Sequence, residues 1–164
     1  MRTNKLFIAA FVAVNAILSA CSGTATQQKK SSAQAEADSL TDVMYEHYDA
    51  FDYAKAVEIG TDALKRYEAL GDSTAMSDVM GAMCIAYLRL GNVAEGLEMS
   101  QKAITLDSIM GDNELLSGDY NNVAGLYLSE DKAAEAEPFI LKAIEYEKKT
   151  PEQSHLSNRY GNAS

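Results

Sequence analysis

The sequence is poor in the residues on which most catalytic sites depend. It contains only two His residues, His47 and His155, and neither lies within a helical turn of a Cys. The candidate nucleophiles Ser73, Ser77 and Ser100 have no base nearby in the sequence. No glycine-rich phosphate loop and no calcium-loop pattern is present. We therefore expect a protein that is not an enzyme and that needs no cofactor or metal.

Tryptophan is absent and positive charge is scarce. The lack of Trp disfavours a sugar-binding protein, which would use aromatic platforms for stacking. The chain has 14 Lys and Arg residues against 24 Asp and Glu residues, a formal net charge of −10. Nucleic-acid binding needs a basic footprint, so this balance argues against it. It argues equally against electrostatic attraction to anionic lipid.

The beginning of the chain has the pattern of an export signal. Arg2 and Lys5 precede an apolar run over residues 6–18, which is short for a permanent membrane span. The small residues before Cys21 resemble the lipobox of bacterial lipoproteins, in which the Cys is acylated and becomes the new N-terminus. An ordinary cleaved signal peptide is the alternative. We assign residues 1–20 to the signal and Cys21 to lipid attachment.

Cleavage of the signal and lipid attachment at Cys21 would affect the rest of the chain in several ways. Cys84 is left without a disulfide partner, and we expect it to fill a small space in the core. Loss of two basic residues with the signal changes the formal charge from −10 to −12. The protein is expected to be exported and anchored to a bacterial envelope membrane, with Ser22 favouring the outer membrane by analogy with bacterial sorting. Residues 21–37, which are polar and small, are predicted to form a flexible tether.

The rest of the chain repeats with a period of forty residues. The stretch from Ala86 to Leu106 contains two amphipathic halves joined at Gly91, and its pattern recurs forty residues earlier and later. Such a period with two helices per unit is typical of a helical solenoid. We therefore predict an all-α fold with units over approximately 38–71, 72–111 and 112–150, followed by half a unit over 151–164.

The repeat resembles the tetratricopeptide family over roughly residues 38–164. The family's pattern of large, small, Tyr, Gly-turn and close-packing Ala positions is matched at Met80, Cys84, Tyr87, Gly91, Gly96 and Ala103. Departures from this pattern are His47 and Phe51 in the first unit and Asp131 in the third. His47 stands in the Tyr position, where we expect a packed or half-buried side chain. The resemblance implies an α-α superhelix whose first helices line a concave groove.

In that family the groove receives an extended peptide or a partner helix, and the repeat register transfers its positions to this chain. The resulting candidates are Tyr45, Tyr48, Asp49, Ile85, Arg89, Asn121, Asn122 and Asn162. Asn122 and Asn162 hold equivalent places, and an Asn amide can pair with a peptide's donor and acceptor together. The basic residues that bind a C-terminal carboxylate in chaperone-binding members are absent. The alternative is a solvated polar face with nothing bound.

Two functions follow from these expectations. The first is a lipid-anchored scaffold or adaptor that binds other proteins of the bacterial envelope. The second is the sensory repeat region of a longer signalling protein, such as a histidine kinase or transcriptional regulator. The last half-unit is either a capping helix or the place where a longer repeat array has been cut, and we favour the cut.

Overall fold

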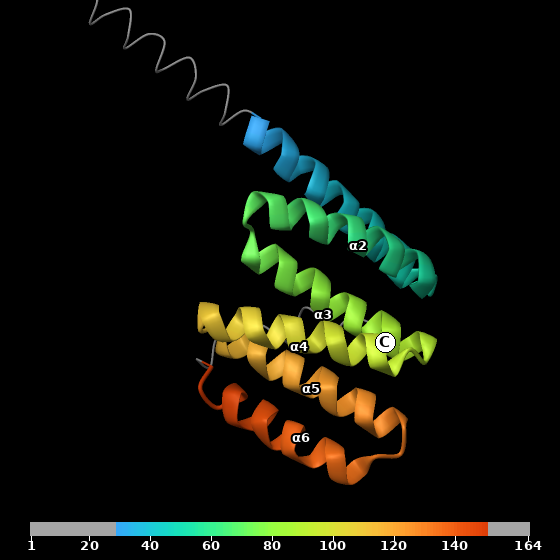
Figure 1. The fold of residues 1–164 in the computed structure, drawn as a ribbon, viewed down its shortest axis with the longest axis vertical. Helices are drawn as coiled ribbons and strands as arrows, with labels where there is room; N and C mark the ends of the chain where they lie inside the picture. The colour runs from blue at the N-terminus through green and yellow to red at the C-terminus, as the bar shows by residue number, and fades with distance from the viewer. Residues whose placement is uncertain (1–28, 151–164) are drawn as a thin grey trace, which may run out of the picture.

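The computed structural model describes residues 29–150, and this part of the chain is helical with no strand, as predicted. Helix α1 covers residues 29–49. It is followed by α2 (Tyr53–Leu70), α3 (Ser73–Leu90), α4 (Val93–Met110), α5 (Asn113–Ser129) and α6 (Ala133–Glu147). Figure 1 shows the helices stacked in chain order along the long axis of the molecule. Each helix packs on the next, and α3 also contacts α5.

Every connection between the helices turns on one residue with a positive φ angle. Three of these residues are Gly71, Gly91 and Gly111, with φ of 71°, 76° and 72°. Phe51 and Asp131 occupy the two remaining connections and adopt φ of 62° and 59°. Phe51 and Asp131 therefore adopt the same left-handed conformation as the three glycines, which glycine adopts without steric cost and other L-residues do not.

The residue that follows each of these left-handed residues is the N-cap of the next helix. The side chains of Asp52, Asp72 and Asp112 accept hydrogen bonds from backbone amides in the first turns of α2, α3 and α5. These bonds satisfy amides that have no partner within the helix. Asn92 and Lys132 occupy the same place before α4 and α6 without a side-chain cap.

The first helix begins earlier than the sequence indicated. We expected a tether over 21–37 and a helix start near Asp38, yet the chain is already helical from residue 29. Ala37 is fully buried and packs in the same apolar cluster as Met44. The polar composition of this stretch misled the prediction, because its small Ala side chain is what allows close packing.

The buried apolar residues form two clusters. The first joins α1, α2 and α3 through Ala37, Met44, Ala56, Ala63, Tyr67, Val79, Ala82 and Met83. The second joins α4, α5 and α6 through Ile104, Leu116, Tyr120, Val123 and Ala143. Ala63, Ala103 and Ala143, which are equivalent in the forty-residue repeat, are 0%, 0% and 7% exposed. The repeat register therefore identifies the close approaches between helices correctly.

Several predictions concerning single residues can be compared with the described part. Cys84 is buried, receives a hydrogen bond from the Ser100 hydroxyl at 2.8 Å, and has a thiol pKa raised by burial to about 11. It is therefore an unreactive core residue, as expected. His47 is half-buried, with Nδ1 3.1 Å from a carboxylate oxygen of Asp52. Within residues 29–150 no helix has the length and apolar character required to cross a bilayer. The signal segment, Cys21 and the half-unit at 151–164 lie outside the described residues.

Replacing Phe51 by Gly should stabilise the protein. The left-handed backbone at Phe51 is strained for a residue with a Cβ, and the Phe51 side chain is 77% exposed, so little packing is lost. Phe51→Gly is expected to raise the free energy of unfolding by about 1 kcal/mol in urea denaturation. Phe51→Ala is the control, because it removes the same ring but retains the Cβ. Equal stability of the two variants would contradict the explanation.

Replacing Ala103 by Glu should destabilise the protein strongly. Ala103 is fully buried, and an unpaired charge at this close approach has no partner. Ala103→Glu is expected to lower the free energy of unfolding by at least about 3 kcal/mol, measured by circular dichroism during urea denaturation. Thr105→Glu, on the exposed side of the same helix, should have little effect. An unchanged melting curve for Ala103→Glu would show that the repeat register is wrong.

Candidate functional site

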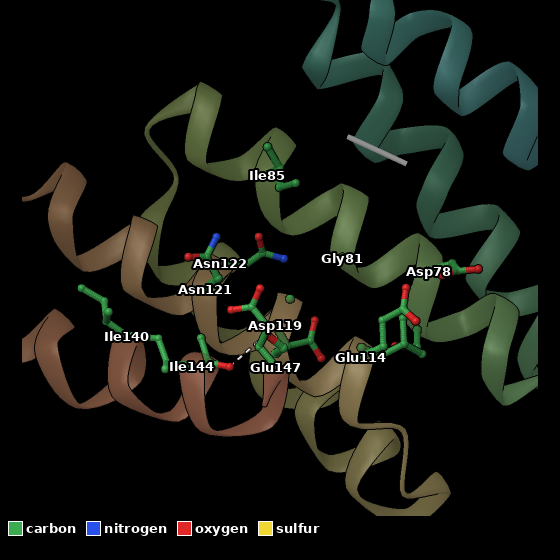
Figure 2. A pocket seen from close by; sticks show the side chains of 15 residues that line it. Asp78, Gly81, Ile85, Glu114, Asp119, Asn121, Asn122, Ile140, Ile144 and Glu147 are labelled. Atoms are coloured by element: carbon green, nitrogen blue, oxygen red, sulfur yellow. Dashed lines mark hydrogen bonds between the residues drawn. The ribbon is translucent and has the colours of Figure 1, made fainter. Parts of the chain in front are cut away.

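A cavity of about 460 Å³ lies between α3, α5 and α6. Its lining comprises Ser77, Asp78, Gly81 and Ile85 from α3, Glu114, Leu115, Ser117, Gly118, Asp119, Asn121 and Asn122 from α5, and Ile140, Ala143, Ile144 and Glu147 from α6. Figure 2 shows Asp119, Asn121 and Asn122 between the labelled residues of α3 and those of α6. A volume of this size is typical of a small-ligand or side-chain pocket.

Glycines make the cavity possible. A Cβ atom added at Gly81 or Gly118 would meet no other heavy atom within 4 Å. These two glycines therefore face open space, in contrast to Gly96, where a Cβ would come within 2.7 Å of the Leu126 side chain. Gly81 and Gly118 belong to α3 and α5, two helices that contact one another, and both glycines line the cavity.

Three of the predicted groove residues meet at this cavity. Ile85, Asn121 and Asn122 all line it. Arg89 lies one turn beyond Ile85 on α3, is exposed and does not line the cavity. The remaining candidates lie elsewhere: Tyr45, Tyr48 and Asp49 belong to α1, and Asn162 is outside the described residues.

The α1 candidates form a separate region. Tyr45 is 39% exposed and Asp49 is exposed, whereas Tyr48 packs edge-to-face on Tyr53 with ring centroids 5.4 Å apart. Tyr48 therefore contributes to the first apolar cluster as well as to the surface. None of the three lines the cavity.

Two carboxyl groups are buried on neighbouring helices, and one of them, that of Asp119, lines the cavity. Asp107 of α4 is fully buried, and Asp119 of α5 is 5% exposed. The Ser77 hydroxyl of α3 donates a hydrogen bond to Asp107 Oδ2 at 2.8 Å. Asp107 Oδ1 and Asp119 Oδ2 receive no hydrogen bond from any other described donor. Ser77, Asp107 and Asp119 thus form one polar cluster on α3, α4 and α5, and this cluster has fewer hydrogen-bond donors than acceptor oxygens.

The two carboxyl groups influence one another's titration. Burial, the hydrogen bond with Asp107 and the negative charge of Asp107 together raise the pKa of Asp119 to about 9. Burial also raises the pKa of Asp107, while hydrogen bonds from Ser77 and Asp119 oppose that rise. Two close carboxylates rarely ionise together. Asp119 is therefore the member of the pair that holds a proton at neutral pH.

The repeat itself contains the signal that would have revealed this pair. Forty residues before Asp119 stands Val79, and forty residues before Asp107 stands Tyr67, both of which are buried in the first apolar cluster. A charged residue in a repeat position that is apolar in the preceding unit indicates a functional or specificity role. Our sequence reading treated the acidic residues as solvated helix faces and did not make this comparison.

The contribution of α6 was also missed. The groove predicted from the family used only the first helix of each unit, whereas α6 is the second helix of the third unit. Ile140, Ile144 and Glu147 nevertheless line the cavity from the α6 side. Ile140 is 37% and Ile144 is 41% exposed, so α6 presents an apolar edge to this opening.

The groups that line the cavity suit hydrogen bonding and apolar contact. They comprise hydroxyl, amide, carboxyl and aliphatic groups, and none of the described lining residues is Lys, Arg, His or Cys. Among residues 29–150 no group of three or more His, Cys, Asp or Glu side chains is arranged to hold a metal ion. A cavity lined in this way can receive an aliphatic chain and hydrogen-bond its polar ends.

Comparison of the chain with protein-family models, with curated proteins and with solved structures yields no match.

Replacing Asp119 by Asn should change how stability depends on pH. The folded-state pKa of about 9 lies above the ordinary value of 3.8, so the folded state binds more protons between these values. The contribution of Asp119 is therefore complete below about pH 4 and is lost as the pH rises towards about 9. The parent should lose up to about 1 kcal/mol of unfolding free energy per pH unit through this group.

Urea denaturation at a series of pH values between these limits measures the effect. Asp119→Asn has no proton to lose, so its stability should decline less steeply and exceed that of the parent at pH values near 8. Asp131→Asn, which removes an exposed carboxyl group, is the matched control and should follow the parent. Parallel curves for the parent and Asp119→Asn would show that Asp119 does not hold the proton.

Proposed function

We propose that the protein is a tetratricopeptide-like solenoid that binds a peptide or a partner helix and acts as a non-enzymatic scaffold. The forty-residue repeat and the regular turns at residues 51, 71, 91, 111 and 131 support the solenoid assignment. So does the contact between α3 and α5, which are the first helices of successive units. Such a contact gives neighbouring first helices a shared face.

One observation carries the binding function. Ile85 of α3 and Asn121 and Asn122 of α5 line the same cavity, and the repeat register assigns all three to the groove. Side-chain amides such as those of Asn121 and Asn122 suit an extended backbone, which offers donors and acceptors in alternation. An aliphatic wall beside them suits a side chain of the bound segment.

The location of the protein is part of the same proposal. The apolar run at residues 6–18 and the small residues before Cys21 support export and acylation at Cys21. A lipid anchor would hold the scaffold at a bacterial envelope membrane, with the outer membrane favoured by Ser22. Partner proteins in the same compartment would then meet the groove at high local concentration.

Selection from a library of random short peptides against the purified protein tests the binding function. Selected peptides should bind the parent and lose affinity at least about tenfold for Gly118→Leu in calorimetric titration. The reason is that Leu at this position projects into the cavity, while the open space around Gly118 leaves the fold unharmed. Leu is also a better helix former than Gly.

Two variants control this test. Gly118→Ala adds a single methyl group and should retain most of the affinity. Thr105→Leu adds the same side chain as Gly118→Leu on the exposed side of α4 and should bind like the parent. Failure to select any peptide, or equal affinity for Gly118→Leu and Thr105→Leu, would refute binding at this groove.

A further inference from the structure

We infer that the cavity between α3, α5 and α6 receives the side chain of a Lys or Arg from the bound protein segment, with Asp119 at its inner end. The inference rests on the proposed peptide-binding function and specifies the chemistry of its ligand. It depends on three features of the described residues: a buried carboxyl pair without a basic partner, an acidic opening, and an aliphatic wall.

The first feature is the buried carboxyl pair of Asp107 and Asp119, in which Asp107 Oδ1 and Asp119 Oδ2 have no hydrogen-bond partner among the described residues. Ser77 is the one described side chain with a hydrogen bond to this pair, and it is neutral. No Lys, Arg or His among residues 29–150 forms an ion pair with either carboxyl group. Buried charges in proteins are ordinarily paired or bound to a cation. Because Asp119 lines the cavity, a cation that enters it can supply the missing partner.

The second feature is the charge of the opening. Glu114 and Glu147 line the cavity from α5 and α6, and none of its described lining residues is basic. Their potential attracts a cation towards the opening. Anionic segments are disfavoured for the same reason. The acidic composition of the whole chain has the same sign, so the local and overall fields cooperate.

The third feature distinguishes a Lys or Arg side chain from a small inorganic cation. Leu115, Ile140 and Ile144 give the cavity an aliphatic wall, which a hydrated metal ion would not use. Lys and Arg carry a hydrocarbon stem that packs on apolar surface while the charged end reaches a polar group. Asn121 and Asn122 lie beside the wall and can hydrogen-bond the backbone from which the stem extends.

The buried carboxyl group of Asp119 lowers the stability of the free protein. Replacement of an apolar repeat residue by Asp119 removes a hydrophobic contact and leaves a buried carboxyl group, both of which are unfavourable for stability. A cation from a partner reverses part of that cost only in the bound state. Binding energy is therefore directed towards segments that carry a positive charge at the correct position.

Nuclear magnetic resonance titration with a matched pair of small probes tests the inference. The probes are Nα-acetyl-lysine methylamide and Nα-acetyl-norleucine methylamide, which share the backbone amides and an aliphatic stem but differ in charge. The lysine probe should shift the backbone amide signals of Gly81 and Gly118 and bind with Kd on the order of 1 mM. The norleucine probe should bind at least about tenfold more weakly.

Variants identify the carboxyl groups responsible. Asp119→Asn should abolish the preference for the lysine probe, whereas Asp131→Asn, with the same change of charge at an exposed position, should retain it. The double variant Glu114→Gln with Glu147→Gln leaves the core intact, so it tests the opening even if Asp119→Asn folds poorly. It should weaken lysine binding about threefold or more.

The outcomes separate this inference from the proposed function. Equal shifts with both probes, shifts confined to residues outside the cavity, or an unchanged preference in Asp119→Asn would overturn it. If selected peptides bind in a Gly118-dependent manner but need no Lys or Arg, peptide binding stands and the basic-residue pocket is wrong. If no peptide binds but the lysine probe does, the cavity recognises a cation without serving a groove.

Discussion

The structure depends on a backbone constraint, the left-handed residue that reverses the chain at positions 51, 71, 91, 111 and 131. Its spacing leaves almost the same length for every helix, so each helix lies antiparallel to its neighbour over its full extent. Glycine meets the constraint three times, and Phe51 and Asp131 meet it at a steric cost. Packing of small residues such as Ala63 and Ala103 then follows from the register that the turns impose.

The forty-residue period predicted the all-α class of the fold, and it aligned Ala63, Ala103 and Ala143, all of which are buried. It succeeded because turns, caps and small residues are local signals that recur. The start of the first helix was missed, since a polar Ala-rich stretch gives no apolar pattern although Ala37 is buried. In the cavity, Ile85, Asn121 and Asn122 were predicted, whereas the α6 wall and Asp119 were not. These depend on how three helices converge, which the period alone does not describe.

The buried carboxyl pair connects stability with recognition. Val79 and Tyr67 show what the preceding unit places at the equivalent positions, namely apolar and aromatic packing. Asp119 and Asp107 give up that packing, and Asp119 holds a proton at neutral pH. Sites for recognition are commonly the places where a fold departs from its most stable composition. The same departure makes this polar cluster sensitive to pH and to any cation that reaches the cavity.

The division of the core into one cluster over α1–α3 and another over α4–α6 has a mechanical consequence. Where α3 meets α4, Ser100 hydrogen-bonds Cys84 and Ser77 hydrogen-bonds Asp107, and Met99 of α4 packs against the first cluster. A tensile load applied along the stack would be carried across this boundary by these contacts. A ligand that spans α3, α5 and α6 would add contacts on both sides of the boundary and increase the force needed to separate the two clusters.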